Sequence, residues 1–467
     1  MKIFFKMLTL GMIKVLYAII AIEGFVSIAT EILCMRQISV FMGNSVLVSS
    51  IIIGVYLLAL SYGYKRGSEY VDNLTTILSR NLIYASGFLG IGLSYWFIYV
   101  FFALAEKILH QGSMFALIAY LSVIIAPLVY FLGQTVPITM NLIQHDQRAG
   151  AIGGRVLHLS ALGSFFGAIS TTVLFMHYLG VKWTVMINCG LLILAVGLLY
   201  SKANTLKHSI ISLVAMLPIV FFVNQQEKLI SPLASNEYSN YIIIPDHKLN
   251  DNRVGSILAV NHSPSSFAEN DTLHGFSYVE KIKDIIFNQL QMQNQNILVL
   301  GAGGFSMSAA GDHGNKFVYV DVDPNLKKIV TKNFIPEIKG DFIASDARLY
   351  LRQNSTKYDV IISDVYSNKN TIPHHLLTKE YFGLIANSLQ DRGLAIFNII
   401  MDPFLNDKYS YRTDNTIRSA FRNCSVTTMD YSGKNSNVLY LCRPGIARDH
   451  SEVYTDNNNS SAIDAIY

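Results

Sequence analysis

The sequence predicts an α-helical membrane domain over residues 1–224 and an open, mostly parallel α/β domain over residues 271–446. The chain has 467 residues, a mean hydropathy of +0.35 and only 15% charged residues, which is too apolar for a soluble enzyme of this length. The apolar excess lies in the first half. From about residue 236, short apolar strands alternate with helical patterns. We expect a linker and a small β-element over residues 225–270, and a disordered polar tail over residues 447–467.

Apolar runs near bilayer length predict seven membrane-spanning helices in the first half. The candidate spans are residues 14–34, 46–64, 82–104, 115–135, 156–179, 184–200 and 208–223. Lys2, Lys6 and Lys14 precede the first span, as in a signal peptide, but no convincing small-residue cleavage site follows. We therefore expect an uncleaved anchor and a multi-pass protein of the cell (inner) membrane.

Two acids lie within the first predicted span. Glu23 and Glu31 are eight residues apart, which places them on one face of a helix. Acids inside a membrane are costly, so they could form a buried polar site that faces other helices. Alternatively, Glu31 simply lies at the interface beside Arg36. In the fifth span, Gly163 and Gly167 have the spacing that lets helices approach closely, and we expect tight packing there.

Basic residues are unevenly distributed among the loops. They cluster before the first span and between spans two and three, four and five, and six and seven. The positive-inside rule therefore places the N-terminus in the cytoplasm. Seven spans would then put the α/β domain outside the cell. Because nucleoside cofactors are cytoplasmic, we expect a cytoplasmic domain instead, which requires one span fewer or more.

Composition argues against nucleic acids and metals. The net charge of +4 is small and spread along the chain, so no nucleic-acid partner is expected. The four cysteines have no paired metal-ligand spacing, and we expect buried, reduced thiols. His374 and His375 are adjacent in a predicted loop without further ligands nearby, so we expect no metal site.

A glycine turn between two predicted strands points to a nucleoside site. The strand 296–300 ends in Gly301, Gly303 and Gly304, and the strand 316–322 is followed or closed by Asp321 and Asp323. Glycines let the backbone approach a ligand, and an acid about 20 residues on can accept both ribose hydroxyls. We therefore expect these five residues to bind a nucleoside.

Two further acids end the next predicted strands. Asp346 follows strand 341–345 and Asp364 follows strand 358–363. A carboxylate at this edge can act as a general base, whereas Asp346 could equally cap a helix. Asp359 lies at the opposite end of its strand and is expected to be structural. Tyr366 lies in the loop that should cover the site, and we expect it to bind substrate.

Several motifs together resemble the spermidine synthase (polyamine aminopropyltransferase) family. They are GAGG at 301–304, VDVDP at 320–324, SDARLYL at 345–351, YDVIISD at 358–364 and LLTKEYF at 376–382. EGFVSIATEILCMR at 23–36 and GQTVPITMNL at 133–142 resemble the multi-pass subgroup fused to membrane helices. The resemblance implies a Rossmann-like domain of the S-adenosylmethionine-methyltransferase type. It also implies a transferase that moves an aminopropyl group from decarboxylated S-adenosylmethionine to a diamine such as putrescine, without a metal.

The resemblance also implies roles for individual residues. Gly301 and Gly303 would line the nucleoside, with Asp321 at the ribose. Asp346 and Ala347 would contact the adenine. Asp364 would be the general base, and Tyr278 and Glu280 would bind the diamine. The expected partners are the lipid bilayer and a second copy of the chain in a homodimer.

The sequence departs from the family pattern where the amines would bind. Gly304 and Ser367 replace acids, Val279 replaces a histidine, and Asn398 stands where glutamine is common. The adenosine half of the site therefore appears complete and the amine half altered. A methyltransferase that uses intact S-adenosylmethionine, or a non-catalytic sensor or transporter of polyamines or adenosyl ligands, remains an alternative.

Overall fold

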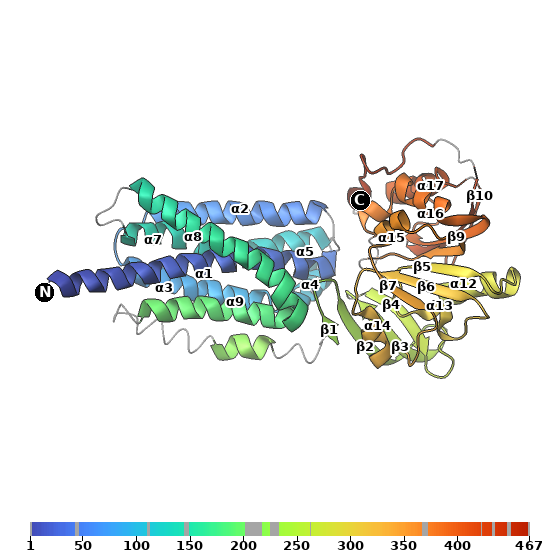
Figure 1. Ribbon diagram of the computed structural model, residues 1–467, viewed down its shortest axis with the longest axis horizontal. Coiled ribbons are helices and arrows are strands. Elements are labelled where there is room, and N and C mark those ends of the chain that lie inside the picture. Colours follow the sequence, from blue (N-terminus) through green and yellow to red (C-terminus); the bar gives the residue numbers. More distant parts are fainter. Residues whose placement is uncertain are drawn as a thin grey trace. The chain divides into compact units, whose positions relative to one another are not determined.

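The computed structural model describes residues 2–42, 46–109, 113–143, 149–200, 217–224, 233–261, 263–366, 372–421, 423–431, 435–445 and 450–465. They form two compact units, one up to Glu237 and one formed mainly by Tyr238–Tyr467 (Figure 1). This boundary lies inside the region that we expected to be linker and β-element.

The first unit is α-helical. Its helices are α1 (Lys2–Met42), α2 (Val46–Ser68), α3 (Leu74–Gly92), α4 (Tyr95–Leu109), α5 (Ser113–Tyr120), α6 (Ala126–Gly133), α7 (Thr135–Ile143), α8 (Ala149–Ile169) and α9 (His177–Tyr200). Two π-helical stretches, η1 (Leu121–Ile125) and η2 (Ser170–Met176), continue α5 and α8. Residues 217–224 are also helical.

Four described helical stretches are long and apolar enough to cross a bilayer, or five if the bent pair Leu74–Gly92 and Tyr95–Ala105 forms one span. The longest stretch, Gly150–Tyr200, has 51 residues and is broken at Gly180, whose φ of 80° is not helical. At 1.5 Å per residue it is more than twice as long as a bilayer core of about 30 Å, so it is long enough for two spans. Part of the expected seventh span, residues 208–216, lies outside the described residues.

Small residues bring α8 against α1, side by side in Figure 1. A Cβ on Gly24 would lie 2.2 Å from the Ser160 carbonyl oxygen, and one on Gly163 would lie 2.1 Å from that of Ala21. One on Gly167 would lie 2.4 Å from that of Phe25. The tight packing predicted for this helix is confirmed.

The chain leaves the first unit beside the C-terminal part of α1. The Arg36 side chain donates to the Asn236 carbonyl oxygen at 2.8 and 2.6 Å, and His177 Nδ1 lies 2.8 Å from Glu237 Oε1. Because α1 has 41 residues and is about 60 Å long, its first residue lies at the other end of the unit. The N-terminus and the exit of the chain are therefore at opposite ends of this unit.

The second unit contains two sheets. The smaller one is antiparallel and includes β2 (Asn240–Lys248), β3 (Val254–Val260) and β4 (Ser263–Glu269), preceded in the chain by β1 (Ala234–Ser235). We predicted β2 and β3, although Pro264 and three serines concealed β4. The larger sheet has the order β10-β11-β9-β8-β5-β6-β7.

The strands of the larger sheet are β5 (Asn296–Leu300), β6 (Lys316–Asp321), β7 (Asp341–Ala344), β8 (Tyr358–Ser363), β9 (Leu389–Met401), β10 (Asn423–Thr428) and β11 (Ser436–Arg443). The first five are parallel, and β11 is antiparallel to both β9 and β10. The parallel α/β sheet and the terminal hairpin that we predicted are confirmed.

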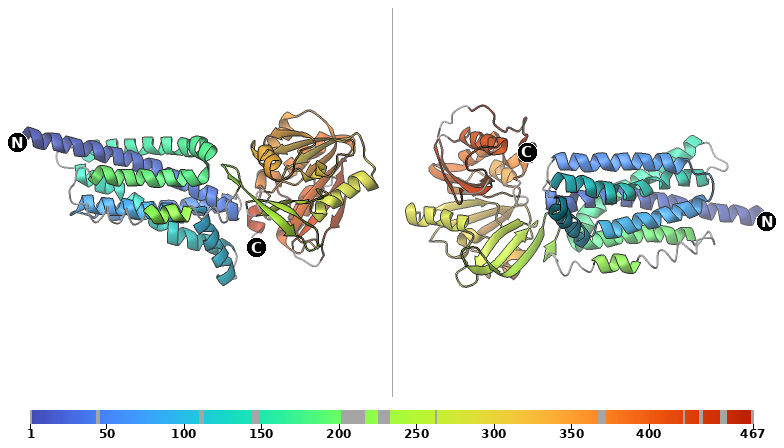
Figure 2. Two further views of the ribbon diagram at one scale, coloured as in Figure 1. Left: turned by 90° about the horizontal axis from the view of Figure 1, so that it is seen from below. Right: turned by 180° about the vertical axis from the view of Figure 1, so that it is seen from behind.

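Short helices connect these strands and pack against the sheet (Figure 2). They are α12 (Ser277–Lys283), continued by η3 (Asp284–Gln289), α13 (Ser306–Ala309), α14 (Leu326–Asn333), α15 (Ala347–Gln353), η4 (His374–Leu376), α16 (Lys379–Ser388), α17 (Lys408–Arg418) and α18 (Ser461–Asp464). Their apolar side chains, with those of the strands, form the core; examples are Leu298, Ile361, Phe382 and Phe397.

Two expectations about the second unit are wrong. Cys424 and Cys442, which we expected to be reduced thiols, form a disulfide across β10 and β11, whereas Cys34 and Cys189 are free and buried. The tail is ordered over residues 450–465. Tyr454 is 1% exposed, and Asp456 forms an ion pair with the buried Arg348 of α15. Low complexity suggested disorder, but single side chains anchor this segment.

Candidate active site

The ends of four neighbouring strands bring the candidate residues together. Leu300 of β5 pairs with Val320 of β6 and with Ser363 of β8, and Ser363 pairs with Phe397 of β9. The residues that directly follow these positions are Gly301, Asp321, Asp364 and Asn398. All four therefore lie at one edge of the sheet, where open α/β sheets bind ligands.

The glycine turn is packed against the backbone of Asp364. Gly301 has a φ of 86°, and a Cβ there would lie 2.2 Å from the Asp364 carbonyl oxygen. Gly303 also has a positive φ, of 49°. Side chains are unfavourable in this conformation. The turn is thus held close to β8, as a backbone that approaches a ligand must be.

Asp321 ends β6 with its carboxylate beside the glycine turn. It accepts hydrogen bonds from the Ala302 N–H at 3.1 Å and the Asp323 N–H at 3.2 Å. Burial, reinforced by the nearby Asp323 charge, raises the pKa of Asp321 to about 6 despite these hydrogen bonds. The half-buried carboxylate keeps acceptor capacity for hydroxyl groups of a ligand.

Asp323 has a different role from the one that we expected. It is 1% exposed, and its carboxylate accepts from the Tyr241 hydroxyl at 2.7 Å and the Asn325 N–H at 2.8 Å. These contacts tie β2 to the start of α14. The structure therefore gives this carboxylate a structural position rather than one at the ligand edge.

Asp364 is held by two side chains from other elements. The Tyr278 hydroxyl donates to its Oδ2 at 2.8 Å, and Asn398 Nδ2 donates to its Oδ1 at 2.9 Å. Burial raises the pKa of Asp364, while both hydrogen bonds act in the opposite direction. A half-buried carboxylate with a fixed orientation and a raised pKa is suited to accept a proton.

Tyr366 supports this arrangement through its hydroxyl group. The hydroxyl accepts from the Ile400 N–H at 2.6 Å and lies 3.3 Å from the Asn398 carbonyl oxygen, to which it donates. It therefore fixes β9 around Asn398, and its expected contact with substrate stays a prediction. Ser367, which stands where the family pattern has an acid, lies outside the described residues.

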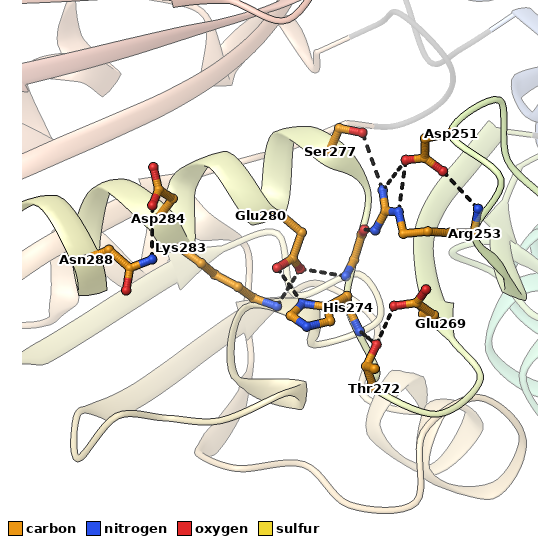
Figure 3. Close-up of polar contacts among 11 residues, drawn as sticks. Asp251, Arg253, Glu269, Thr272, His274, Ser277, Glu280, Lys283, Asp284 and Asn288 are labelled. Atoms are coloured by element: carbon orange, nitrogen blue, oxygen red, sulfur yellow. Dashed lines mark hydrogen bonds and ion pairs between the residues drawn. The ribbon is translucent and has the colours of Figure 1, made fainter.

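Glu280 is engaged by its own surroundings (Figure 3). Its Oε1 accepts from the Gly275 N–H at 2.6 Å and Lys283 Nζ at 2.8 Å, and its Oε2 lies 2.7 Å from His274 Nδ1. Burial alone would raise the pKa of Glu280, but these three contacts together lower it. Glu280 thus already has a cationic partner in Lys283, and its expected contact with a diamine ammonium stays a prediction.

Asp346 combines a cap with a loop contact. Its carboxylate accepts from the Leu349 N–H at 2.9 Å, which caps α15, and from His375 Nε2 at 3.1 Å. Burial opposes ionisation, but these hydrogen bonds outweigh it and lower the pKa of Asp346. Ala347 begins α15 and is buried. No group of three or more metal-ligating side chains occurs among the described residues.

The space beside Gly304 is filled by neutral groups that the sequence did not reveal. A Cβ there would lie 2.4 Å from Phe334 Cε1 and 2.7 Å from Ser266 Cβ. The Gly304 N–H donates to Ser266 Oγ at 2.8 Å. Ser266 comes from β4, the strand that we did not predict. Val279, the other departure, is buried in the core and is 3% exposed.

The sheet order, with one antiparallel strand inserted next to the last, defines an α/β domain of the S-adenosylmethionine-methyltransferase type. Residues 275–435 match the model of the spermine/spermidine synthase domain. This part of the chain is therefore similar to that domain family.

Two curated relatives are similar to part of this domain. A probable polyamine aminopropyl transferase of Bifidobacterium longum is 24% identical over 134 residues, which are 29% of this chain and 30% of the relative. Polyamine aminopropyltransferase 2 of Pseudomonas aeruginosa is 25% identical over 138 residues, 27% of this chain and 40% of the relative. The match thus spans well under half of each relative.

Among solved structures, a probable spermidine synthase from Corynebacterium glutamicum is 22% identical, with a TM-score of 0.37. The similarity covers 46% of this chain and 81% of that one.

Proposed function

We propose that the chain is a membrane-anchored aminopropyltransferase that moves an aminopropyl group from decarboxylated S-adenosylmethionine to a small amine. The observation that carries this proposal is Asp364, held by Tyr278 and Asn398 beside the glycine turn. The domain family and the names of the two curated relatives support the reaction class.

The residues fit a nucleoside co-substrate. The turn at Gly301 permits close backbone approach, and Asp321 can accept ribose hydroxyl hydrogens. By the family resemblance, Asp346 and Ala347 would contact the adenine. These residues would hold the co-substrate so that its sulfonium-bound methylene faces Asp364.

The reaction balances around Asp364. An attacking ammonium has no lone pair, so Asp364 first accepts one of its protons. The amine nitrogen then forms a bond to the methylene carbon, and the carbon–sulfur bond breaks. Methylthioadenosine leaves as a neutral thioether, and the proton ends on Asp364 or solvent. Because proton transfer and in-line positioning are both needed, the fixed orientation of the carboxylate matters.

The amine half of the site is specialised. Phe334 and Ser266 fill the space where an acid would contact the aminopropyl ammonium, and Glu280 is neutralised by Lys283. Fewer acids therefore remain to bind a second cation. We propose that the acceptor is not restricted to putrescine, since recognition depends less on charge at both ends.

The first experiment supplies the detergent-solubilised protein with mixed diamines and either decarboxylated or intact S-adenosylmethionine. We expect methylthioadenosine from the first co-substrate alone, identified by mass. S-adenosylhomocysteine from the second would make the protein a methyltransferase. If neither product forms, the proposed reaction with the supplied amines is rejected.

A matched pair of variants tests Asp364. Asp364→Asn should lower kcat by about 10²- to 10⁴-fold, the usual contribution of a general base. Asp359→Asn, at the other end of β8, should retain turnover, because that carboxylate only accepts from the Asn296 N–H at 2.9 Å. Equal turnover of wild type and Asp364→Asn would remove Asp364 from the mechanism.

The helices of the first unit support a membrane location, and we propose that the α/β domain lies across the bilayer from the N-terminus. The exit of the chain beside Arg36 supports this placement. With a cytoplasmic N-terminus from the positive-inside rule, the domain would be external; with the cytoplasmic domain that we expected, the N-terminus would be external instead. Protease digestion of the domain and of the N-terminus from the same face of oriented vesicles would refute the proposed placement.

A further inference from the structure

One face of α1 carries a row of polar side chains. Glu23, Ser27, Thr30 and Glu31 follow the spacing i, i+4, i+7 and i+8, so they share one side of the helix. The two acids are eight residues apart, which is about 12 Å along the axis. The proposed reaction does not use any of these residues.

The row contains buried polar atoms without partners. Glu23 is 2% exposed, and its Oε2 has no hydrogen-bond partner among the described residues. Its carboxylate otherwise contacts Ser160 of α8. Thr30 is fully buried, and its hydroxyl also has no partner in the described part of the chain. Such groups are costly inside a membrane, and an ionisable residue there is a candidate binding site.

Tyr56 of α2 lies between the two acids. Its hydroxyl lies 2.9 Å from Ser27 Oγ and donates to the Ser27 carbonyl oxygen at 2.5 Å. Tyr56 interacts electrostatically with both Glu23 and Glu31 and is 2% exposed. No Lys or Arg forms an ion pair with either acid among the described residues. Two carboxyl groups and several hydroxyl oxygens therefore lie on this face of α1 without a side-chain cation among the described residues.

We propose that this face of α1 binds a linear polyamine, with its terminal ammonium groups at Glu23 and Glu31 and its middle part along Ser27, Thr30 and Tyr56. The separation of Glu23 and Glu31 along α1 determines which linear amine fits. A four-carbon diamine spans about 6 Å between its nitrogens and a triamine with one more aminopropyl group about 11 Å, from bonds near 1.5 Å. The triamine matches the 12 Å row, so the site fits the reaction product better than its diamine substrate. This identification of the ligand rests on the proposed function.

The test uses the full-length protein in detergent, without a nucleoside, and measures thermal stabilisation by linear amines of increasing length. We expect the triamine to stabilise at the lowest concentration, before diamines, ammonium or Na⁺. Glu23→Gln and Glu31→Gln should each raise the half-maximal triamine concentration at least about tenfold. Glu69→Gln, an exposed acid paired with Arg66 at the end of α2, should leave it unchanged.

If Glu23→Gln does not fold, Glu31→Gln and Tyr56→Phe supply the same comparison. Stabilisation that is independent of amine length, or unchanged in the foldable acid variants, would overturn the proposal. Stabilisation by Na⁺ as effective as by the triamine would also overturn it, in favour of a simple cation site. Methylthioadenosine formation is measured in parallel. Its absence, with length-dependent stabilisation retained, would reject the proposed reaction and keep the site.

Discussion

The Tyr278 hydroxyl donates to Oδ2 of Asp364 at 2.8 Å, which joins the start of α12 to the end of β8. This bond favours the ionised carboxylate and opposes the effect of burial on its pKa. Tyr278→Phe should therefore raise the pKa of Asp364 further. A net hydrogen bond of about 1 kcal/mol corresponds to roughly 0.7 pH units.

In the proposed reaction Asp364 must be ionised to accept a proton, so kcat/KM should decrease at pH values below the pKa of Asp364. We expect the acid limb of the pH–rate profile to move upward in Tyr278→Phe. Tyr241→Phe is the matched control, since it removes a hydroxyl that donates to Asp323 instead. An acid limb that moves equally in both variants would contradict a specific role for Tyr278.

Asp364→Asn should preserve or increase stability while it removes activity. The folded-state pKa is raised by burial, so the ionised side chain destabilises the fold as pH rises above about 3.9, the usual value for Asp. The asparagine variant lacks this cost. Its melting temperature at pH 7 should equal or exceed that of the wild type, and the difference should shrink at pH 4. A lower melting temperature at pH 7 would contradict this account.

Binding of methylthioadenosine should depend on the ionisation of Asp321. Its pKa is raised to about 6, and protonation removes acceptor capacity for the ribose hydroxyls. Affinity should therefore fall as pH decreases through about 6, as calorimetry at pH 7.5 and 5 can measure. Asp321→Asn should bind weakly at both values. A pH-dependent affinity in that variant would assign the titration to another group.

Gly304→Ala should destabilise the α/β domain by about 1–3 kcal/mol, because the new methyl group overlaps Phe334 and Ser266. Gly383→Ala on α16 is the control, since a Cβ there meets no atom within 4 Å. Alanine also favours a helix over glycine, so this control should be neutral or stabilising. The free energy of unfolding from denaturant titration distinguishes the two. A neutral Gly304→Ala would mean that Phe334 can move aside.

Residues at strand ends could be predicted because runs of apolar residues show where each buried strand begins and ends. The runs 296–300 and 358–363 place Gly301 and Asp364 at one edge without knowledge of any contact. The partners of Asp323 and Glu280, which are Tyr241 and Lys283, could not be predicted in this way. A sequence pattern gives the position of an acid but not the side chains that satisfy it.

The disulfide could have been predicted. The runs 425–429 and 437–441 were assigned to a hairpin, and their register pairs Ser425 with Leu441. Cys424 and Cys442 flank these residues and must oppose each other. In contrast, the contact of Ser266 with Gly304 could not be anticipated, because it depends on how the small sheet packs against the larger one.

The redox state of the Cys424–Cys442 pair in cells should depend on the compartment in which the domain matures. Cytoplasmic thiol buffers keep such pairs reduced, whereas external compartments keep them oxidised. The redox state of this hairpin in whole cells, trapped by alkylation, thus reports sidedness without any engineered tag. An oxidised pair would agree with the exit of the chain beside Arg36.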